Sequence, residues 1–172
     1  MQTNGRPPNS LSLRVKVFNL IKERSFARGR FILVSGRESP FYLDLKTTML
    51  HPEGAGILAD LILQRLEGVQ VDYIGGIAVG AVPLVTAVNV VSHMKSRPIP
   101  GFFVRKQGKD HGTRKRIEAA GDIRGKRVVV LDDVTTTGSS AMEAVTAVQE
   151  DGAIVSLVLS IVDREEGAAA FY

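Results

Sequence analysis

An apolar run and a turn of small polar residues decide the fold, and together they read Arg127-Val128-Val129-Val130-Leu131-Asp132-Asp133-Val134-Thr135-Thr136-Thr137-Gly138-Ser139-Ser140. The apolar run at 127–131 predicts a buried strand. Beyond the turn, Ala141, Ala144, Val145 and Val148 recur at helical spacing and predict a helix from about residue 139 to 150. The sequence here therefore predicts a strand, a polar turn and a helix in succession.

The same alternation continues on both sides of this stretch. Further strands are expected at 73–77, 99–104 and 154–162, and a helix is expected from about residue 83 to 94. The pattern predicts an α/β fold with a central, mainly parallel sheet flanked by helices. Ligands of such sheets bind beyond the carboxyl ends of the strands, so function is expected in the segments that follow each apolar run.

The amino-terminal third of the chain has a different pattern. Leu13, Val17, Leu20 and Ile21 line one face of an expected helix. Two extended segments at 31–34 and 41–45 then flank a turn, and a second helical pattern follows Pro52 until Gly68 ends it. A chain of 172 residues is expected to bury one core, which predicts a single domain over residues 1–172.

Composition excludes several classes of function. The chain has no cysteine, so disulfides, thiolate catalysis and cysteine-bound zinc are excluded, and its three histidines are not at metal-binding spacing. A formal net charge of +4 suggests anionic partners but is modest for a nucleic-acid binder. The longest apolar run is far below the roughly 20 residues of a membrane span, and residues 1–10 carry no signal pattern, so we expect a cytoplasmic protein.

The turn after the strand at 127–131 has the composition of a phosphate site. A helix begins with unpaired N–H groups and the positive end of a dipole, and a hydroxyl-rich turn with a glycine lets an anion approach them. Asp132 and Asp133, just upstream, can accept hydrogen bonds from the hydroxyls of a sugar. The alternative is that these side chains only cap the helix and shape a turn.

A cationic loop follows the strand at 99–104. Residues 105–116 hold six Lys or Arg, two glycines and one acid, and we expect such a loop, over about residues 105–119, to be mobile and attracted to polyanions. A diphosphate is one candidate. A solvated surface loop or a nucleic-acid patch would have the same composition.

These motifs together resemble the type I phosphoribosyltransferase family and, within it, the orotate phosphoribosyltransferases, over roughly residues 31–167. The resemblance implies that Asp132 and Asp133 contact the ribose of phosphoribosyl diphosphate (PRPP), while the turn that follows holds its 5′-phosphate. The residues implied in PRPP binding at this turn are Asp132, Asp133, Val134, Thr135, Thr136, Thr137, Gly138, Ser139 and Ser140.

The cationic loop resembles the catalytic loop of the same enzymes through Arg-Lys-x-x-Lys-Asp-His-Gly. The resemblance implies that Arg105, Lys106, Lys109 and His111 contact the diphosphate, with Lys109 and His111 acting in the chemical step. Residues 75–83 resemble the pyrophosphate loop, although glycines at a strand–helix junction often serve packing alone. The resemblance also implies a homodimer in which this loop reaches the neighbouring subunit's site.

The resemblance also implies that residues near both ends of the chain bind the acceptor base. Arg164, in Asp163-Arg164-Glu165-Glu166-Gly167, resembles the arginine that binds orotate, and a surface ion pair with Glu165 or Glu166 is the alternative. Residues 1–50 resemble a hood over the base, where Tyr42 and Leu43 match positions against orotate, and Thr136 is also expected to contact it.

Two positions depart from the family pattern. Val34 and Val79 stand where relatives often carry a lysine, and we expect Lys46 to supply one missing charge to PRPP. The chain also ends at Tyr172, where relatives usually continue through a further helix and strand. We interpret this as either a truncated or a naturally short form.

The predicted reaction is orotate plus PRPP giving orotidine 5′-monophosphate and pyrophosphate, in pyrimidine biosynthesis. Mg²⁺ is expected on the diphosphate of PRPP, with no direct protein ligand. Small molecules are the expected partners, with neither nucleic acid nor membrane among them. Two alternatives stay open: transfer to another nucleobase, and a regulator that keeps the PRPP site as a sensor.

Overall fold

The structure, a computed structural model, describes residues 10–32, 36, 38–106 and 116–170. Its contacts divide the chain into two compact units, residues 1–65 and 66–172. The first unit extends beyond residue 50, where the hood was expected to end, because the helix at 52–65 packs within it. Val34, Lys109 and His111 lie outside the described residues.

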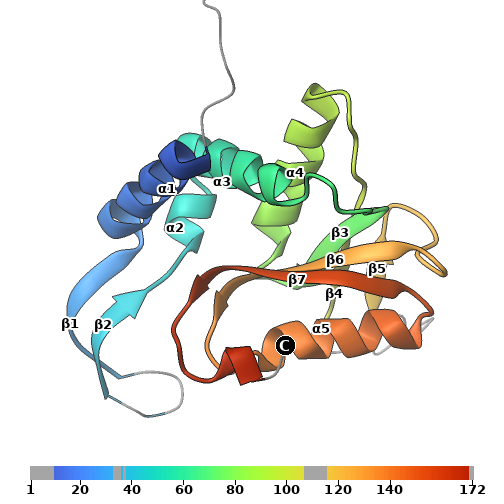
Figure 1. The fold of residues 1–172 in the computed structure, drawn as a ribbon. Helices are drawn as coiled ribbons and strands as arrows, with labels where there is room; N and C mark the ends of the chain where they lie inside the picture. Colours follow the sequence, from blue (N-terminus) through green and yellow to red (C-terminus); the bar gives the residue numbers. More distant parts are fainter. Residues whose placement is uncertain (1–9, 33–35, 37, 107–115, 171–172) are drawn as a thin grey trace, which may run out of the picture. The chain divides into compact units, whose positions relative to one another are not determined.

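A five-stranded sheet forms the centre of the second unit (Figure 1). Its strand order is β5-β4-β3-β6-β7, and every neighbouring pair is parallel except β4 with β5. The predicted α/β fold with a mainly parallel sheet is therefore confirmed. The strands are β3 (Tyr73–Ile77), β4 (Gly101–Val104), β5 (Ile117–Ala119), β6 (Arg127–Thr135) and β7 (Ile154–Asp163).

Two helices cover opposite faces of this sheet. Helix α4 (Val82–Met94) lies on one face, and helix α5 (Ser139–Glu150) runs along the other (Figure 1). Val128 and Val130 of β6 pack with Ala144 and Val148 of α5, and all four are completely buried. Strand β6 is apolar without alternation up to Leu131 because both of its faces are covered.

The amino ends of β3 and β6 are joined by polar contacts. The Asp72 N–H donates to the Arg127 carbonyl at 2.8 Å, and the Arg127 N–H donates to Asp72 Oδ2 at 2.8 Å. Arg127 Nε lies 3.3 Å from the same carboxylate. The backbone and side-chain hydrogen bonds from Arg127 hold the pKa of Asp72 below its ordinary value, so the carboxylate remains charged at neutral pH.

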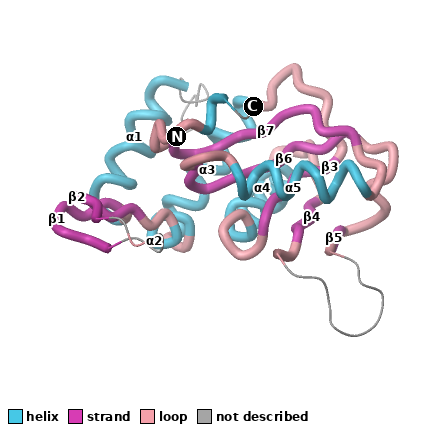
Figure 2. The backbone as a smooth tube through the Cα atoms, turned by 90° about the horizontal axis from the view of Figure 1, so that it is seen from below, coloured by secondary structure: helices cyan, strands magenta, loops and turns pink. Residues whose placement is uncertain are grey.

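The first unit combines three helices with a two-stranded hairpin. Strands β1 (Phe26–Ile32) and β2 (Glu38–Leu43) are antiparallel and lie side by side (Figure 2). Helices α1 (Ser10–Arg24) and α3 (Pro52–Arg65) confirm the two helices expected there. The four-residue helix α2 (Lys46–Met49) was not predicted.

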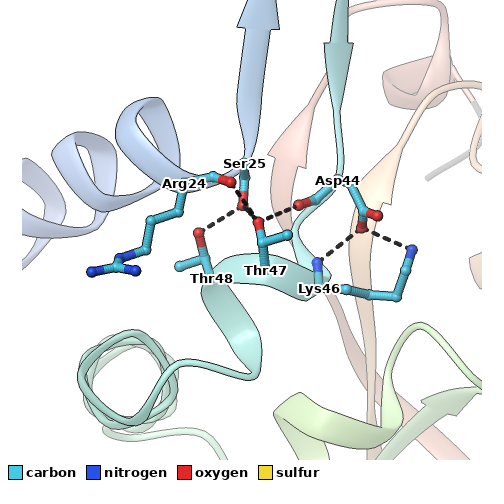
Figure 3. Close-up of polar contacts among 6 residues, drawn as sticks. All are labelled: Arg24, Ser25, Asp44, Lys46, Thr47 and Thr48. Atoms are coloured by element: carbon cyan, nitrogen blue, oxygen red, sulfur yellow. Dashed lines mark hydrogen bonds and ion pairs between the residues drawn. The ribbon is translucent and has the colours of Figure 1, made fainter.

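A polar network holds α2 against the start of β1 (Figure 3). Ser25 Oγ lies 2.7 Å from Thr48 Oγ1 and 2.9 Å from Thr47 Oγ1, and the Thr47 hydroxyl lies 2.7 Å from the Arg24 carbonyl. Ser25 and Thr48 are both buried, so their hydroxyls satisfy each other away from water. Helix α2 is thus fixed by contacts distant in sequence.

Other details differ from the sequence expectation, because the hairpin strands span 26–32 and 38–43 where extended segments were expected at 31–34 and 41–45. Strand β6 continues through both acids to Thr135, and the short strand β5 was not predicted. After β7, the described part of the chain ends in a 3₁₀ turn at Ala168–Ala170. In the part of the chain that the structure describes, no helix is long and apolar enough to cross a membrane.

Candidate active site

The turn between β6 and α5 leaves the start of the helix open. Gly138 stands at the N-cap of α5 with φ 84°, in the left-handed region that glycine enters without strain. Glycine has no side chain with which to cap the helix, so the N-cap position makes no side-chain hydrogen bond. Thr137 and Ser139 instead approach each other at 3.3 Å between their hydroxyl oxygens. The N-cap residue itself therefore supplies no side-chain cap, and an anion at the start of this helix stays a prediction.

The two acids at the end of β6 point to opposite faces of the sheet, since side chains alternate along a strand. Asp132 shares the face of Val128 and Val130, beneath α5, and is only 7% exposed. Burial, and secondly the charge of Asp133, raise the pKa of Asp132 to about 6, whereas the charge of Lys106 lowers it. Lys106 therefore acts electrostatically on the first acid.

Asp133 faces the loop between β3 and α4. A Cβ atom added to Gly80 would lie 2.9 Å from Asp133 Oδ1, so the absence of a side chain at Gly80 lets this carboxylate lie against the loop backbone. The acid and the loop predicted to bind pyrophosphate are thus direct neighbours. Neither hydrophobic periodicity nor composition had singled out Gly80 for this contact.

Gly75 and Gly76 do not belong to that loop but lie inside β3. Added Cβ atoms would meet the Phe102 carbonyl oxygen at 2.4 Å and the Leu131 carbonyl oxygen at 2.1 Å. These two glycines allow β3 to approach its neighbouring strands, as the packing alternative held. Val79, at the position where relatives often carry a lysine, is 73% exposed.

The ends of the cationic loop are joined by β4 and β5. The Arg105 N–H donates to the Arg116 carbonyl at 2.8 Å, and the Arg105 side chain forms an ion pair with Glu118 at 3.1 Å. Arg116 also contacts Glu143 of α5. These contacts tie both ends of the loop to the sheet and to the helix that carries the turn. Glu118 and Glu143 had no sequence signal, because their partners are distant along the chain.

Arg164 lies at the carboxyl end of β7, next to the turn. Its N–H donates to the Thr135 carbonyl at 3.0 Å, and its side chain is 14% exposed. Arg164 Nε lies 3.1 Å from Glu166 Oε1, so the ion pair considered as an alternative is present. The structure therefore brings Arg164 to the same edge of the sheet as Asp132, Asp133 and Thr135.

The remaining site residues belong to the first unit. Tyr42 is 46% exposed and its ring centroid lies 5.5 Å from that of Phe31, while Leu43 is half-buried. Lys46 Nζ lies 2.8 Å from Asp44 Oδ1 (Figure 3). Burial raises the pKa of Asp44, but its hydrogen bonds with Lys46 and the charge of Lys46 together outweigh it, and the pKa lies below its ordinary value. Lys46 is thus already paired with an acid of its own unit.

The site's oxygen donors fit a magnesium ion carried by the substrate. Mg²⁺ is usually held by one or two carboxylates together with substrate phosphates and water, rather than by a protein cage. Because Asp132 and Asp133 lie on opposite faces of the sheet, each could supply only a single carboxylate oxygen donor, and residues 10–32, 36, 38–106 and 116–170 contain no group of three or more His, Asp or Glu arranged for a metal. Such an ion would neutralise part of the diphosphate charge.

Known proteins with this arrangement are phosphoribosyltransferases. The phosphoribosyl transferase domain model matches residues 47–170. Orotate phosphoribosyltransferase of Rhodopseudomonas palustris (strain BisB5) is 53% identical over 158 residues, which cover 90% of this chain and 84% of that protein. Orotate phosphoribosyltransferase of Nostoc sp. (strain PCC 7120) is 42% identical over 94% of this chain and 78% of its own length.

A solved structure shows the same likeness. The orotate phosphoribosyltransferase of Mycobacterium tuberculosis H37Rv in complex with PRPP has a TM-score of 0.77 at 35% identity, over 92% of this chain and 88% of that chain. The family match spans well over half of the chain, and the relatives exceed 30% identity over most of their own length. The chain therefore belongs to the phosphoribosyltransferase family, in its orotate phosphoribosyltransferase branch.

Proposed function

We propose that this protein transfers the 5-phosphoribosyl group of PRPP to orotate, giving orotidine 5′-monophosphate and pyrophosphate in the synthesis of pyrimidine nucleotides. The observation that carries this proposal is the open start of α5 directly after two neighbouring acids. Backbone N–H groups and the helix dipole suit the 5′-phosphate, and the acids suit the ribose diol. The orotate specificity of the relatives supports the choice of base.

The groups proposed to bind PRPP lie at the carboxyl end of β6, on both faces of the sheet. The turn residues 135–140 receive the 5′-phosphate, while Asp132 and Asp133 accept hydrogen bonds from the ribose hydroxyls. Asp133 lies against Gly80, which supports the proposal that the backbone of the β3–α4 loop borders the anomeric side of the same sugar. This arrangement orients the C1′ carbon toward the base, and positioning of this kind supplies much of the rate.

In the chemical step, a ring nitrogen of the orotate anion forms a bond to C1′ while the bond from C1′ to the diphosphate oxygen breaks. The electron pair of that bond leaves with pyrophosphate, so negative charge develops there. Arg105 and Lys106 stand at the start of the loop that would stabilise it, and Lys109 and His111 are proposed for the same task by family resemblance. Bound Mg²⁺ would add electrostatic stabilisation of the diphosphate.

Selection of the base is assigned to Arg164. A guanidinium can form a bidentate pair with the carboxylate of orotate, and uracil lacks that carboxylate. Thr136 lies beside this arginine's backbone partner, Thr135, and is the candidate for a further base contact. Tyr42 and Leu43 are proposed to cover the base, and Lys46 is proposed to contact PRPP after leaving Asp44.

A homodimer with the cationic loop acting in the neighbouring subunit, and a cytoplasmic location, complete the proposal. The sequence also leaves two other functions open: transfer to another base, and a PRPP-sensing regulator. Arg164 at the site edge favours an acceptor with a carboxylate over an unsubstituted base. Turnover itself separates an enzyme from a sensor.

The test is a turnover assay with each base. Folded protein is incubated with Mg²⁺, PRPP and orotate, uracil or a purine, and loss of the absorbance of each base is followed. We expect orotate to be consumed and the others to react at least about 100-fold more slowly, because they lack the group that Arg164 recognises. Turnover of another base alone would move the protein to a different specificity, and no turnover would refute the enzyme.

A further inference from the structure

The chain reverses its direction immediately after Arg164. Glu165 has φ 56° and Gly167 has φ 108°, so left-handed backbone flanks Glu166 on both sides. Asp163 fixes the start of this turn, because its Oδ1 accepts the Glu165 N–H at 2.8 Å. Ala168, 1% exposed, anchors the end. A residue other than glycine in the left-handed region costs about 1 kcal/mol, so the turn at Glu165 needs this support.

The reversal places the Glu166 carboxylate against the Arg164 guanidinium. Oε1 lies 3.1 Å from Nε, which makes an ion pair although Nε is not aligned for a hydrogen bond, and the Glu166 and Arg164 side chains are 27% and 14% exposed. The backbone of Arg164 is held separately by the Thr135 carbonyl at the end of β6. The attraction between this carboxylate and the planar guanidinium restricts where the guanidinium can lie, and with it the direction of its two terminal amino groups.

We infer that Glu166 is a positioning residue for recognition of the acceptor's carboxylate: it holds the Arg164 guanidinium in the plane and direction in which the acceptor meets it. The inference rests on the proposed function and deepens it, since Glu166 itself need not touch the substrate. An arginine ordered before binding loses less side-chain freedom when the acceptor arrives. The competing possibility is that Glu166 occupies the place of the acceptor's carboxylate and must be displaced.

Steady-state kinetics with orotate and PRPP distinguish these roles. Glu166→Ala should raise the KM for orotate by about 3- to 10-fold, the effect expected from one disordered side chain. The KM for PRPP should stay within about twofold, since the turn residues that hold its phosphate are unchanged. Glu166→Gln, which keeps an oxygen acceptor at the same place, should restore most of the loss.

Glu165 provides a matched control one residue away. Glu165→Asn removes an exposed carboxylate and places asparagine, which tolerates left-handed backbone, at φ 56°. This variant should keep the parental KM for orotate. Arg164→Ala gives the largest rise in KM for orotate that is expected, because it removes the guanidinium that Glu166 orients. Thermal unfolding of each variant, and orotate binding by calorimetry, separate altered recognition from loss of the fold.

The outcomes are distinct. If Arg164→Ala loses orotate recognition but Glu166→Ala and Glu166→Gln keep the parental KM, the inference is wrong and the proposed function stands. A lower KM for orotate in Glu166→Ala would overturn positioning in favour of competition. An equal rise in KM for both substrates would show a general structural role instead. If the parent protein does not turn over orotate, both the proposed function and the inference fail.

Discussion

At the scale of single residues, Asp132 carries a stability cost that the site requires. Its pKa of about 6 in the folded protein exceeds the ordinary value of 3.8, so the folded protein binds this proton more tightly than the unfolded chain does. Between those two values the protein loses stability as the pH rises, and above pH 6 the full cost remains. The ionised form, which is the one proposed to accept sugar hydroxyls, is therefore the less stable one.

Asp132→Asn should accordingly raise the free energy of unfolding at pH 7.5, by up to about 3 kcal/mol, while lowering activity. The amide keeps the shape of the side chain and removes the buried charge. Urea unfolding of parent and variant at pH 7.5 and pH 5 tests this, with a smaller difference expected at pH 5. A gain that does not change with pH would show that the charge is not its source.

Gly80→Ala should damage PRPP binding with little effect on stability. The new Cβ would come within 2.9 Å of Asp133 Oδ1, and a flexible carboxylate can move aside at low cost to the fold. We expect kcat/KM for PRPP to fall roughly 10- to 100-fold, because a small displacement of a positioning group has a large effect on rate.

A double-mutant cycle provides the control for Gly80. In an Asp133→Ala background, the atom that the new Cβ displaces is gone, so Gly80→Ala should add little further loss. If the two losses simply added, the substitution at Gly80 would act through the loop backbone and not through Asp133.

At the scale of elements, two glycines of α3 should behave in opposite ways. A Cβ at Gly54 would lie 2.2 Å from the Thr48 carbonyl oxygen of α2, whereas a Cβ at Gly56 would meet nothing within 4 Å. Gly54→Ala should destabilise the protein by about 1–3 kcal/mol through overpacking against backbone. Gly56→Ala should stabilise it by about 0.5–1 kcal/mol, because alanine is the better helix former.

Urea unfolding of the two variants measures both effects under one condition. Each substitution is the matched control of the other, since they share a helix and a chemical change. Equal effects of the same sign would mean that the close approach of α3 to α2 does not constrain the first unit.

Elements with local signals could be predicted from the sequence, and those fixed by distant contacts could not. The β6 strand, the turn and α5 follow from hydrophobic pattern and composition within one stretch. Helix α2 has four residues and depends on hydroxyl contacts with Ser25, and β5 has three residues that pair only with β4. Both elements are too short to produce a detectable hydrophobic periodicity in the sequence.

The site residues also fall into those with a local sequence signal and those fixed by distant contacts. Asp132, Asp133 and the turn were predicted because strand, acids and helix start are contiguous in sequence. The contact of Gly80 with Asp133 joins loops of two different strands, and no pattern in either loop indicates it. The role inferred for Glu166 depends on left-handed backbone at Glu165, which single-sequence propensities do not predict.

At the scale of the whole molecule, the proposal of a loop shared between subunits can be tested by mixing inactive variants. Lys109→Ala impairs the loop and Asp133→Asn impairs the sugar site. If loops cross, a mixed dimer contains one site in which both groups are intact, and random mixing in equal amounts should restore about a quarter of the parental activity. Activity after subunit exchange is the measurement.

Each variant alone, and size-exclusion chromatography of the mixture, serve as controls. No recovery from a mixture that contains mixed dimers would place the loop in its own subunit's site. Recovery without any dimer would point to an artefact of the preparation.

The contacts between Asp72 and Arg127 lie at the amino ends of β3 and β6, whereas the acids, the turn and Arg164 lie at the carboxyl ends. The groups that join these strands are therefore separate from those proposed to bind the reactants. One consequence is evolutionary: changes in acceptor preference can accumulate at one edge while the other keeps the scaffold intact. A lineage of such proteins can diversify its chemistry through a few substitutions without passing through unfolded intermediates.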